Sequence, residues 1–158
     1  TDDVNATYDG NIAIYHYMNV EDATTYGGDI SSSWQATAND LISASYAYTH
    51  TKNNQTGTEL VGKPEHTAML TWDKKINEKL QWINQLRYES KHLVSTASRA
   101  YSPDWMTVNT KLNYQMNPNL SLYAGVNNVF DEQKDSKDAN DQRPVDSRQW
   151  LAGATLHF

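Results

Sequence analysis

The chain has 158 residues, a formal net charge of −6 and a hydrophobic fraction of 38%, with 10 Tyr and 5 Trp against 2 Phe and no Cys. This size fits one domain or a piece of one. The net negative charge does not indicate the basic surface that nucleic-acid binding needs. The lack of Cys excludes a disulfide framework and a thiolate metal site. No apolar run reaches the roughly 18 to 20 residues of a membrane-spanning helix. This does not exclude a membrane β-barrel, because the strands of a barrel face lipid only at every second residue.

Apolar and polar residues alternate with a period of two along nearly the whole chain, which predicts antiparallel strands and no helix. The first predicted strand lies near residues 11–19, where the pattern leaves the two faces ambiguous. About eight strands of roughly nine to twelve residues are expected, close to the length that a tilted strand needs to cross a bilayer. The apolar parity of the later strands is carried by Ile30, Trp34 and Ala36; Ile42, Ala44, Tyr46 and Tyr48; Ala68, Leu70 and Trp72; Leu80, Trp82, Leu86 and Tyr88; Met106, Val108, Leu112, Tyr114 and Met116; Leu120, Leu122, Ala124, Val126 and Phe130; and Trp150, Ala152, Ala154, Leu156 and Phe158.

The connections between these strands alternate in length. Short polar turns are predicted near residues 38–40, 76–79 and 117–119, and long polar loops near 51–64, 94–103 and 131–147. A soluble sandwich has no reason to place all long loops at one end, whereas an outer-membrane barrel turns tightly in the periplasm and carries its long loops outside. The alternation therefore favours the barrel.

Aromatic residues of the apolar parity gather at the two ends of the predicted strands. Two such belts are typical of the two interfaces of a membrane barrel, where an amphipathic ring is most stable. Trp and Tyr also favour strands in general, and Trp105 falls on the polar parity. The predicted membrane girdle comprises Trp34, Trp72, Trp82, Tyr114 and Phe158 near the short turns, and Tyr88, Phe130 and Trp150 near the long loops.

Several stretches resemble the C-terminal region of TonB-dependent outer-membrane receptors. Residues 123–133 (YAGVNNVFDEQ) resemble the penultimate-strand motif of this family, although Val129 replaces the usual Leu and the final Tyr is missing. Residues 148–158 (RQWLAGATLHF) resemble the closing strand with its terminal aromatic residue, although Ser147 replaces a Gly. Residues 17–34 and 62–72 are similar to two further motifs of the family.

The resemblance implies an all-β fold: an antiparallel transmembrane β-barrel segment that supplies about eight strands of a 22-stranded barrel. Residues 1–158 would then be the C-terminal portion of the barrel, with the plug domain absent from this sequence. The alternative is a complete eight-stranded outer-membrane barrel with a structural or adhesion role. A soluble lipocalin-like binder fits less well, because its outer surface would be polar.

The function that the resemblance implies is the uptake of a ferric siderophore through the bacterial outer membrane, by a receptor of the catecholate and colicin-receptor branch. The siderophore is then the transported ligand, and no cofactor and no catalytic residue are expected. The expected partners are the remainder of the barrel and its plug domain, the TonB complex, lipopolysaccharide and outer-membrane lipids, and a colicin or phage.

The residues themselves show no catalytic or metal-binding pattern, since the five His contain no H-E-x-x-H and no pair at metal spacing on one strand face. A triply negative ferric catecholate needs Arg or Lys together with aromatic rings at the outer mouth of its receptor. Arg99, Tyr101 and Trp105 supply these groups in one loop and are the predicted ligand contacts, although they are also ordinary loop residues. Polar-parity residues are expected to point into the lumen, namely Arg87, Glu89, Lys91, Lys111 and Gln149.

Overall fold

The computed structural model describes residues 2–9, 12–19, 22–133 and 146–156, and these residues form strands, turns and loops without any helix. In that part of the chain, no helix is long and apolar enough to span a membrane. All pairings between the strands are antiparallel. The predicted all-β, antiparallel fold class is confirmed.

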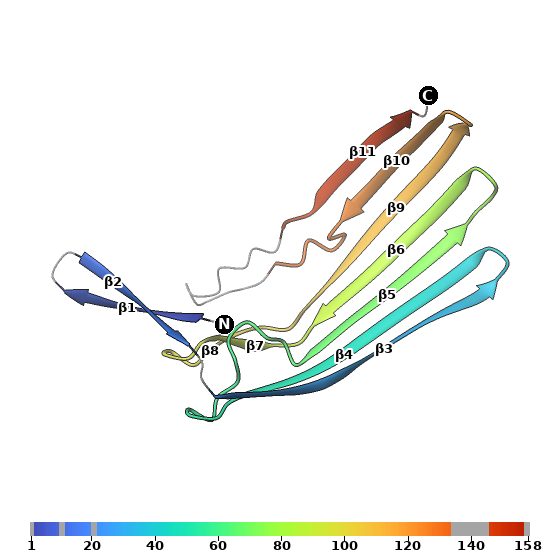
Figure 1. Ribbon diagram of the computed structural model, residues 1–158. Coiled ribbons are helices and arrows are strands. Elements are labelled where there is room, and N and C mark those ends of the chain that lie inside the picture. The colour runs from blue at the N-terminus through green and yellow to red at the C-terminus, as the bar shows by residue number, and fades with distance from the viewer. Residues whose placement is uncertain (1, 10–11, 20–21, 134–145, 157–158) are drawn as a thin grey trace.

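A seven-stranded sheet forms the body of the structure, with strand order β11-β10-β9-β6-β5-β4-β3. Figure 1 shows it as one continuous wall, with the short turns at one end and the long connections at the other. We call these the turn end and the loop end. The strands are β3 (Ala23–Thr37), β4 (Asp40–Asn53), β5 (His66–Lys75), β6 (Leu80–Glu89), β9 (Trp105–Asn117), β10 (Leu120–Asn127) and β11 (Gln149–Leu156).

Local side-chain hydrogen bonds close the short turns. Asn77 Oδ1 accepts from the backbone N–H of Lys79 and of Leu80, both at 2.9 Å, and Asn117 Oδ1 accepts from the N–H of Asn119 at 2.9 Å. A short Asn side chain that bonds its own backbone two or three residues further on favours a tight turn over continued strand. The predicted turns near 38–40, 76–79 and 117–119 are confirmed.

Two small hairpins lie outside the seven-stranded sheet: β1 (Asp2–Asp9) with β2 (Ile12–Asn19), and β7 (His92–Ser95) with β8 (Ala100–Ser102). The prediction of a strand near 11–19 is confirmed, but its expected place as a strand of the wall is wrong, because β2 pairs with β1. Only two residues separate β1 from β2, a connection length that is typical of a tight antiparallel hairpin. No strand was predicted at 2–9 or within the loop 94–103.

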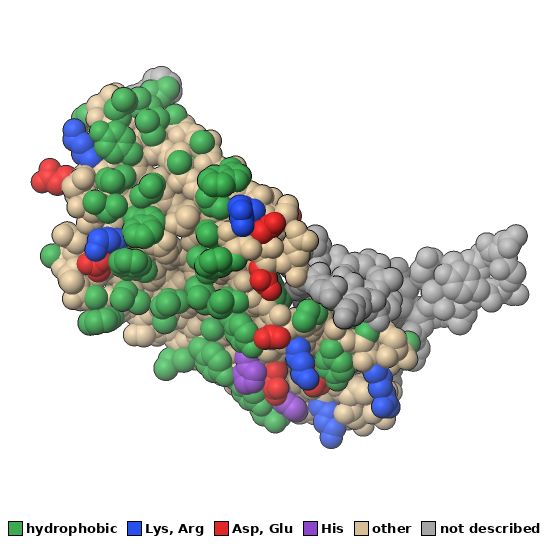
Figure 2. Space-filling view, turned by 180° about the vertical axis from the view of Figure 1, so that it is seen from behind, with side chains coloured by type: hydrophobic (Ala, Val, Ile, Leu, Met, Phe, Trp, Pro, Cys, Tyr) green, Lys and Arg blue, Asp and Glu red, His purple; other side chains and the backbone are tan. Residues whose placement is uncertain are grey.

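Directly paired residues share a face, so the register carries the predicted apolar parity across the wall, with shifts only beside two of the short turns, at Gln35/Thr37 and Leu120/Ser121. Trp34 pairs with Ile42 and Ile42 with Trp72; further along, Tyr114 pairs with both Leu80 and Leu122. We call this side the apolar face and the opposite side the polar face. Figure 2 shows the hydrophobic side chains spread over the apolar face.

The wall has almost no core of its own. Among the described residues Leu93 is the one buried hydrophobic side chain, at 2% exposure, while Ile30 and Trp34 are 69% and 64% exposed. An apolar surface this extensive marks a contact with membrane or protein. The apolar face is therefore built to be covered by something other than this segment.

Candidate ligand-binding wall and loops

Hydrogen-bonded polar side chains cover the polar face. Gln81 Nε2 donates to both carboxylate oxygens of Asp73 at 2.8 and 2.7 Å, and Asn113 Nδ2 donates to Gln81 Oε1 at 3.3 Å. One row of bonds thus crosses β5, β6 and β9. Four of the residues expected to point into the lumen lie on this face: Arg87, Glu89, Lys111 and Gln149.

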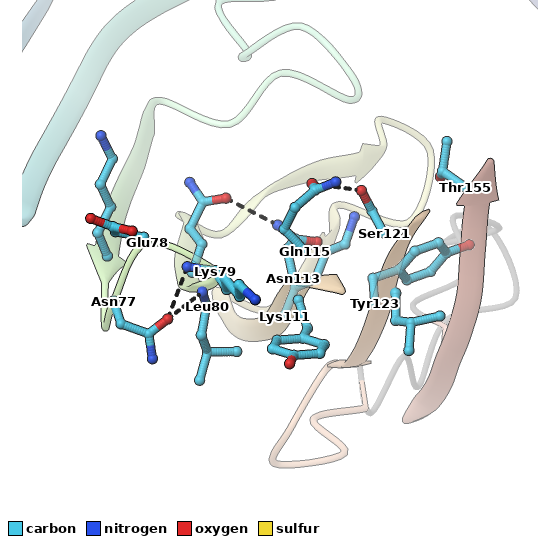
Figure 3. A pocket seen from close by; sticks show the side chains of 14 residues that line it. Asn77, Glu78, Lys79, Leu80, Lys111, Asn113, Gln115, Ser121, Tyr123 and Thr155 are labelled. Atoms are coloured by element: carbon cyan, nitrogen blue, oxygen red, sulfur yellow. Dashed lines mark hydrogen bonds between the residues drawn. The ribbon is translucent and has the colours of Figure 1, made fainter. Parts of the chain in front are cut away.

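An open pocket of about 710 Å³ lies at the turn end of this wall, lined from β5, β6, β9, β10 and β11. Figure 3 shows Gln115 and Ser121 hydrogen bonded beside Tyr123, and the Ser121 hydroxyl donates to Gln115 Oε1 at 2.8 Å. Lys111 Nζ lies 4.5 Å from the centre of the Tyr123 ring, within cation–π range. Three Lys and one Glu line the pocket, namely Lys75, Lys79, Lys111 and Glu78.

At the loop end, the polar face carries an ion pair that is hydrogen bonded to an indole ring. Arg87 Nη2 donates to Glu89 Oε1 at 2.6 Å, and Trp105 Nε1 donates to Glu89 Oε2 at 3.2 Å. The Arg87 guanidinium lies 5.7 Å from the centre of the Trp105 ring. Glu89 is buried while the Arg87 side chain is 54% exposed, so the carboxylate holds the guanidinium in place and leaves part of it open to the lumen side.

The β7–β8 hairpin brings a second cation to an aromatic ring. Tyr101 pairs with Leu93 across the hairpin, is 49% exposed, and lies with its ring centre 5.5 Å from Lys91 Nζ. His92 and Ser102 pair at the base of the hairpin, and both are buried. Arg99 lies in the turn of the hairpin in the left-handed region, with φ of 52°.

The predicted ligand residues therefore fall into separate surroundings. Trp105 joins Arg87 and Glu89, and Tyr101 joins Lys91, while Arg99 lies at the hairpin turn. Lys91 and Arg87 were expected on the lumen side without a part in ligand contact. Both residues could have been found from the sequence as cations at the end of a strand that leads into a loop with Tyr and Trp.

The predicted membrane girdle has all its described members on the apolar side or next to it. The rings of Trp72 and Trp82 lie 5.4 Å apart, and Trp72 Nε1 donates to Asp40 Oδ1 at 3.0 Å. Lys74 Nζ also donates to Asp40 Oδ1, at 3.2 Å, so the turn end of this face carries a polar anchor for its indole rings. Contact of the girdle with lipid stays a prediction, and Phe158 lies outside the described residues.

The described side chains of the wall offer groups for binding a ligand. Within the described residues no three His, Cys, Asp or Glu side chains could hold a metal ion together. What the wall presents is cations beside aromatic rings at the loop end, and amides, hydroxyls and Lys at the turn end.

Comparison with known proteins gives a family and a fold. The family model described as "TonB dependent receptor-like, beta-barrel" matches residues 1–129. The iron-regulated outer membrane virulence protein of Vibrio cholerae serotype O1 is 28% identical over 127 residues, which cover 73% of this chain and 19% of that protein. The chain thus spans about a fifth of the length of the curated relatives that it matches.

Solved structures resemble nearly the whole chain. The copper transporter OprC superposes with a TM-score of 0.80 at 20% identity, covering 98% of this chain and 26% of that one. A mutant of the ferric enterobactin receptor PfeA of Pseudomonas aeruginosa gives a TM-score of 0.75 at 22% identity, covering 99% and 26%. At these identities the likeness establishes the barrel-wall fold alone.

Proposed function

The chain belongs to the TonB-dependent receptor β-barrel family, and from that membership we propose that it forms the last wall strands of an outer-membrane receptor that takes up a ferric siderophore. Receptors of this family are transporters rather than enzymes and carry no enzymatic cofactor. The relatives and structural neighbours are outer-membrane proteins, so we place this chain in the bacterial outer membrane.

The observation that carries the substrate class is the pairing of cations with aromatic rings at the loop end. Arg87 lies over Trp105 and Lys91 over Tyr101, and both pairs reach the side from which a ligand would arrive. A ferric catecholate is anionic and aromatic, so each pair offers it one charge contact and one ring contact. Iron uptake agrees with the names of the iron-regulated Vibrio relative and of the ferric enterobactin receptor.

The proposal includes the partners that such a receptor requires. The remainder of the barrel would pair with the edge strands β3 and β11, and a plug domain would lie against the polar face. The TonB complex would act on that plug. Lipopolysaccharide and outer-membrane lipids would cover the apolar face, and a colicin or phage would bind the external loops.

The test is ferric-siderophore binding and uptake by the full-length receptor that contains this segment. Lys91→Gln, Tyr101→Leu and Trp105→Leu should each weaken binding of a ferric catecholate by about three- to tenfold, because each removes one charge or ring contact worth on the order of 1 kcal/mol. Lys74→Gln is the matched control, since Lys74 also lies beside a Trp ring but on the apolar face at the turn end. Unchanged binding in all three variants would contradict the proposed ligand class.

A further inference from the structure

A group of titratable side chains lies on the apolar face at the loop end, away from the ligand-binding wall. His50 Nδ1 lies 3.1 Å from Glu65 Oε1, and His66 Nε2 lies 4.0 Å from Glu65 Oε2. The Tyr46 hydroxyl lies 2.8 Å from His66 Nδ1. One carboxylate is thus held between two imidazoles, and we call His50, Glu65 and His66 the histidine cluster.

Rings and backbone hydrogen bonds hold the histidine cluster in place. The Tyr26 ring centre lies 4.8 Å from that of His50, and the Tyr48 ring centre lies 5.3 Å from that of His66. The backbone N–H of Thr49 donates to the Glu65 carbonyl at 2.8 Å. The cluster is therefore part of the β4–β5 pairing and does not depend on a free loop.

The cluster occupies the level at which the wall changes from apolar to charged. Along β4 toward the loop end, the apolar face presents Ala44, Tyr46, Tyr48, His50 and Lys52 in turn. A membrane strand follows this order as it leaves the hydrocarbon, passes the aromatic belt and meets the charged headgroups. Figure 2 shows histidine side chains beside acidic and basic ones at this lower end of the hydrophobic face.

We infer that His50, Lys52 and His66 form a binding site for the phosphate groups of anionic glycolipid in the outer leaflet, with Glu65 holding the two imidazoles in position. The inference rests on the proposed function, since it requires this wall to cross the outer membrane. Imidazolium and ammonium N–H groups donate strong, charge-assisted hydrogen bonds to phosphate oxygens. The His50 and Glu65 side chains are 33% and 43% exposed and His66 is 42% exposed, so all three are accessible to a headgroup.

Protonation sets the charge of this site. The hydrogen bond with His50 is the main cause that lowers the pKa of the Glu65 carboxyl below its ordinary value, with smaller contributions from Tyr48 and from the charge of His66. An ionised Glu65 offsets the charge of Lys52, so the site becomes net positive as soon as one imidazole carries a proton, and each added positive charge strengthens its attraction for phosphate. The titratable or charged groups that face the imidazoles are Tyr26 of β3, Tyr46, Tyr48 and Lys52 of β4, Glu65, and Tyr88 of β6.

The experiment measures lipid retained by the purified full-length receptor in detergent, using native mass spectrometry. Diphosphorylated lipid A and its dephosphorylated form are offered at about pH 5.5 and about pH 8, on either side of the ordinary His pKa. At the lower pH, we expect the wild-type receptor to retain about tenfold more of the diphosphorylated lipid A than of the dephosphorylated form. We expect the double variant His50→Gln/His66→Gln to retain the same amount of lipid at both pH values. Lys52→Gln should lower lipid retention at both pH values. The control Lys74→Gln should change neither the amount of lipid retained nor its pH dependence. Excess inorganic phosphate should not displace the lipid.

The results separate this inference from the proposed function. Equal retention of the two lipids by the wild-type receptor would overturn the phosphate site, and that comparison needs no substitution that could disturb folding. A pH dependence that survives in the double His variant, or complete displacement by inorganic phosphate, would overturn it as well. A receptor that imports ferric siderophore normally but shows no lipid preference would refute the lipid site alone. Preserved lipid preference in a receptor that binds no ferric siderophore would support the site and count against the proposed ligand.

Discussion

At the scale of single residues, neighbours on one strand meet opposite surroundings. Leu86 lies on the apolar face of β6, between Trp82 toward the turn end and Tyr88 toward the loop end, and Gln85 lies on the polar face. Leu86→Arg should therefore cost about 2 to 4 kcal/mol, the range for a cation on the lipid face near the middle of the bilayer. The guanidinium-unfolding midpoint of the full-length receptor and the amount assembled in outer membranes measure this loss.

Gln85→Arg is the matched control, because the same side chain one residue away points to the polar face. It should leave assembly nearly unchanged. An equal loss in both variants would show that the assignment of the faces is wrong.

The Glu65 carboxyl makes a second prediction at this scale, and its direction follows from the lowered pKa. A carboxyl whose pKa is lower in the folded protein contributes stability above its ordinary value of 4.5, and this contribution is lost as the pH falls through the lower, folded pKa. Glu65→Gln should therefore lower the thermal midpoint of the full-length receptor slightly at near-neutral pH. The difference from wild type should vanish well below pH 4.5. A difference that grows toward acid would contradict the contact with His50.

At the scale of elements, the approach of β10 to β9 requires a residue without a side chain. A Cβ added to Gly125 would lie 2.7 Å from the Thr110 carbonyl oxygen, which is closer than real Cβ atoms come to backbone. Gly125→Val should therefore push β10 from β9 and destabilise the receptor by about 1 to 3 kcal/mol, the usual range for overpacking. Gly28→Val in β3 is the matched control, since an added Cβ there meets nothing within 4 Å. Guanidinium-unfolding midpoints that shift equally in the two variants would contradict this reading of the β9–β10 contact.

The strands and their faces could be predicted from the sequence because they follow from local alternation. The period of two and the polar turn residues gave the wall strands, their apolar parity and the short turns. The pairing of β2 with β1 could not be predicted in this way, because alternation indicates that a segment is a strand but does not indicate its partner. The β7–β8 hairpin could not be predicted either, because its two strands are only 4 and 3 residues long and are too short to show alternation.

The candidate site was predictable in its residue types more than in its contacts. Arg99, Tyr101 and Trp105 stood out as a cation and two rings in one loop, but the contact of Trp105 with Glu89 depends on the β6–β9 register. The histidine cluster could not be predicted from the sequence for a similar reason. His50 and Glu65 are separated by a long loop, and the β4–β5 pairing is what brings them together.

At the scale of the whole molecule, the two ends of the wall should lie on opposite sides of the outer membrane. In the full-length receptor, a single Cys at Asn54 in the loop after β4 should react with a membrane-impermeant thiol reagent on intact cells. A single Cys at Asn117, the last residue of β9 before the short turn to β10, should react only after the outer membrane is permeabilised, because short turns of outer-membrane barrels face the periplasm. Labelling of Asn117→Cys alone on intact cells would invert the orientation. A third predicted external site, Asp138, lies outside the described residues.

The two open edges of the wall predict that this segment does not form a closed barrel by itself. β3 (Ala23–Thr37) and β11 (Gln149–Leu156) each pair on one side only among the described strands, and neither pairs with the other. Backbone groups left unpaired in hydrocarbon cost several kcal/mol each, so these edges require further strands. Closure of the segment on itself would also bring Arg87, Glu89 and Lys111 into a narrow lumen, where charges need a complete network of partners. Refolded alone in detergent, the 158-residue chain should therefore give no compact monomer whose gel mobility shifts on boiling, whereas the full-length receptor should show that shift. A compact monomer with β2 or β3 hydrogen bonded to β11 would instead favour the complete small barrel over the receptor wall.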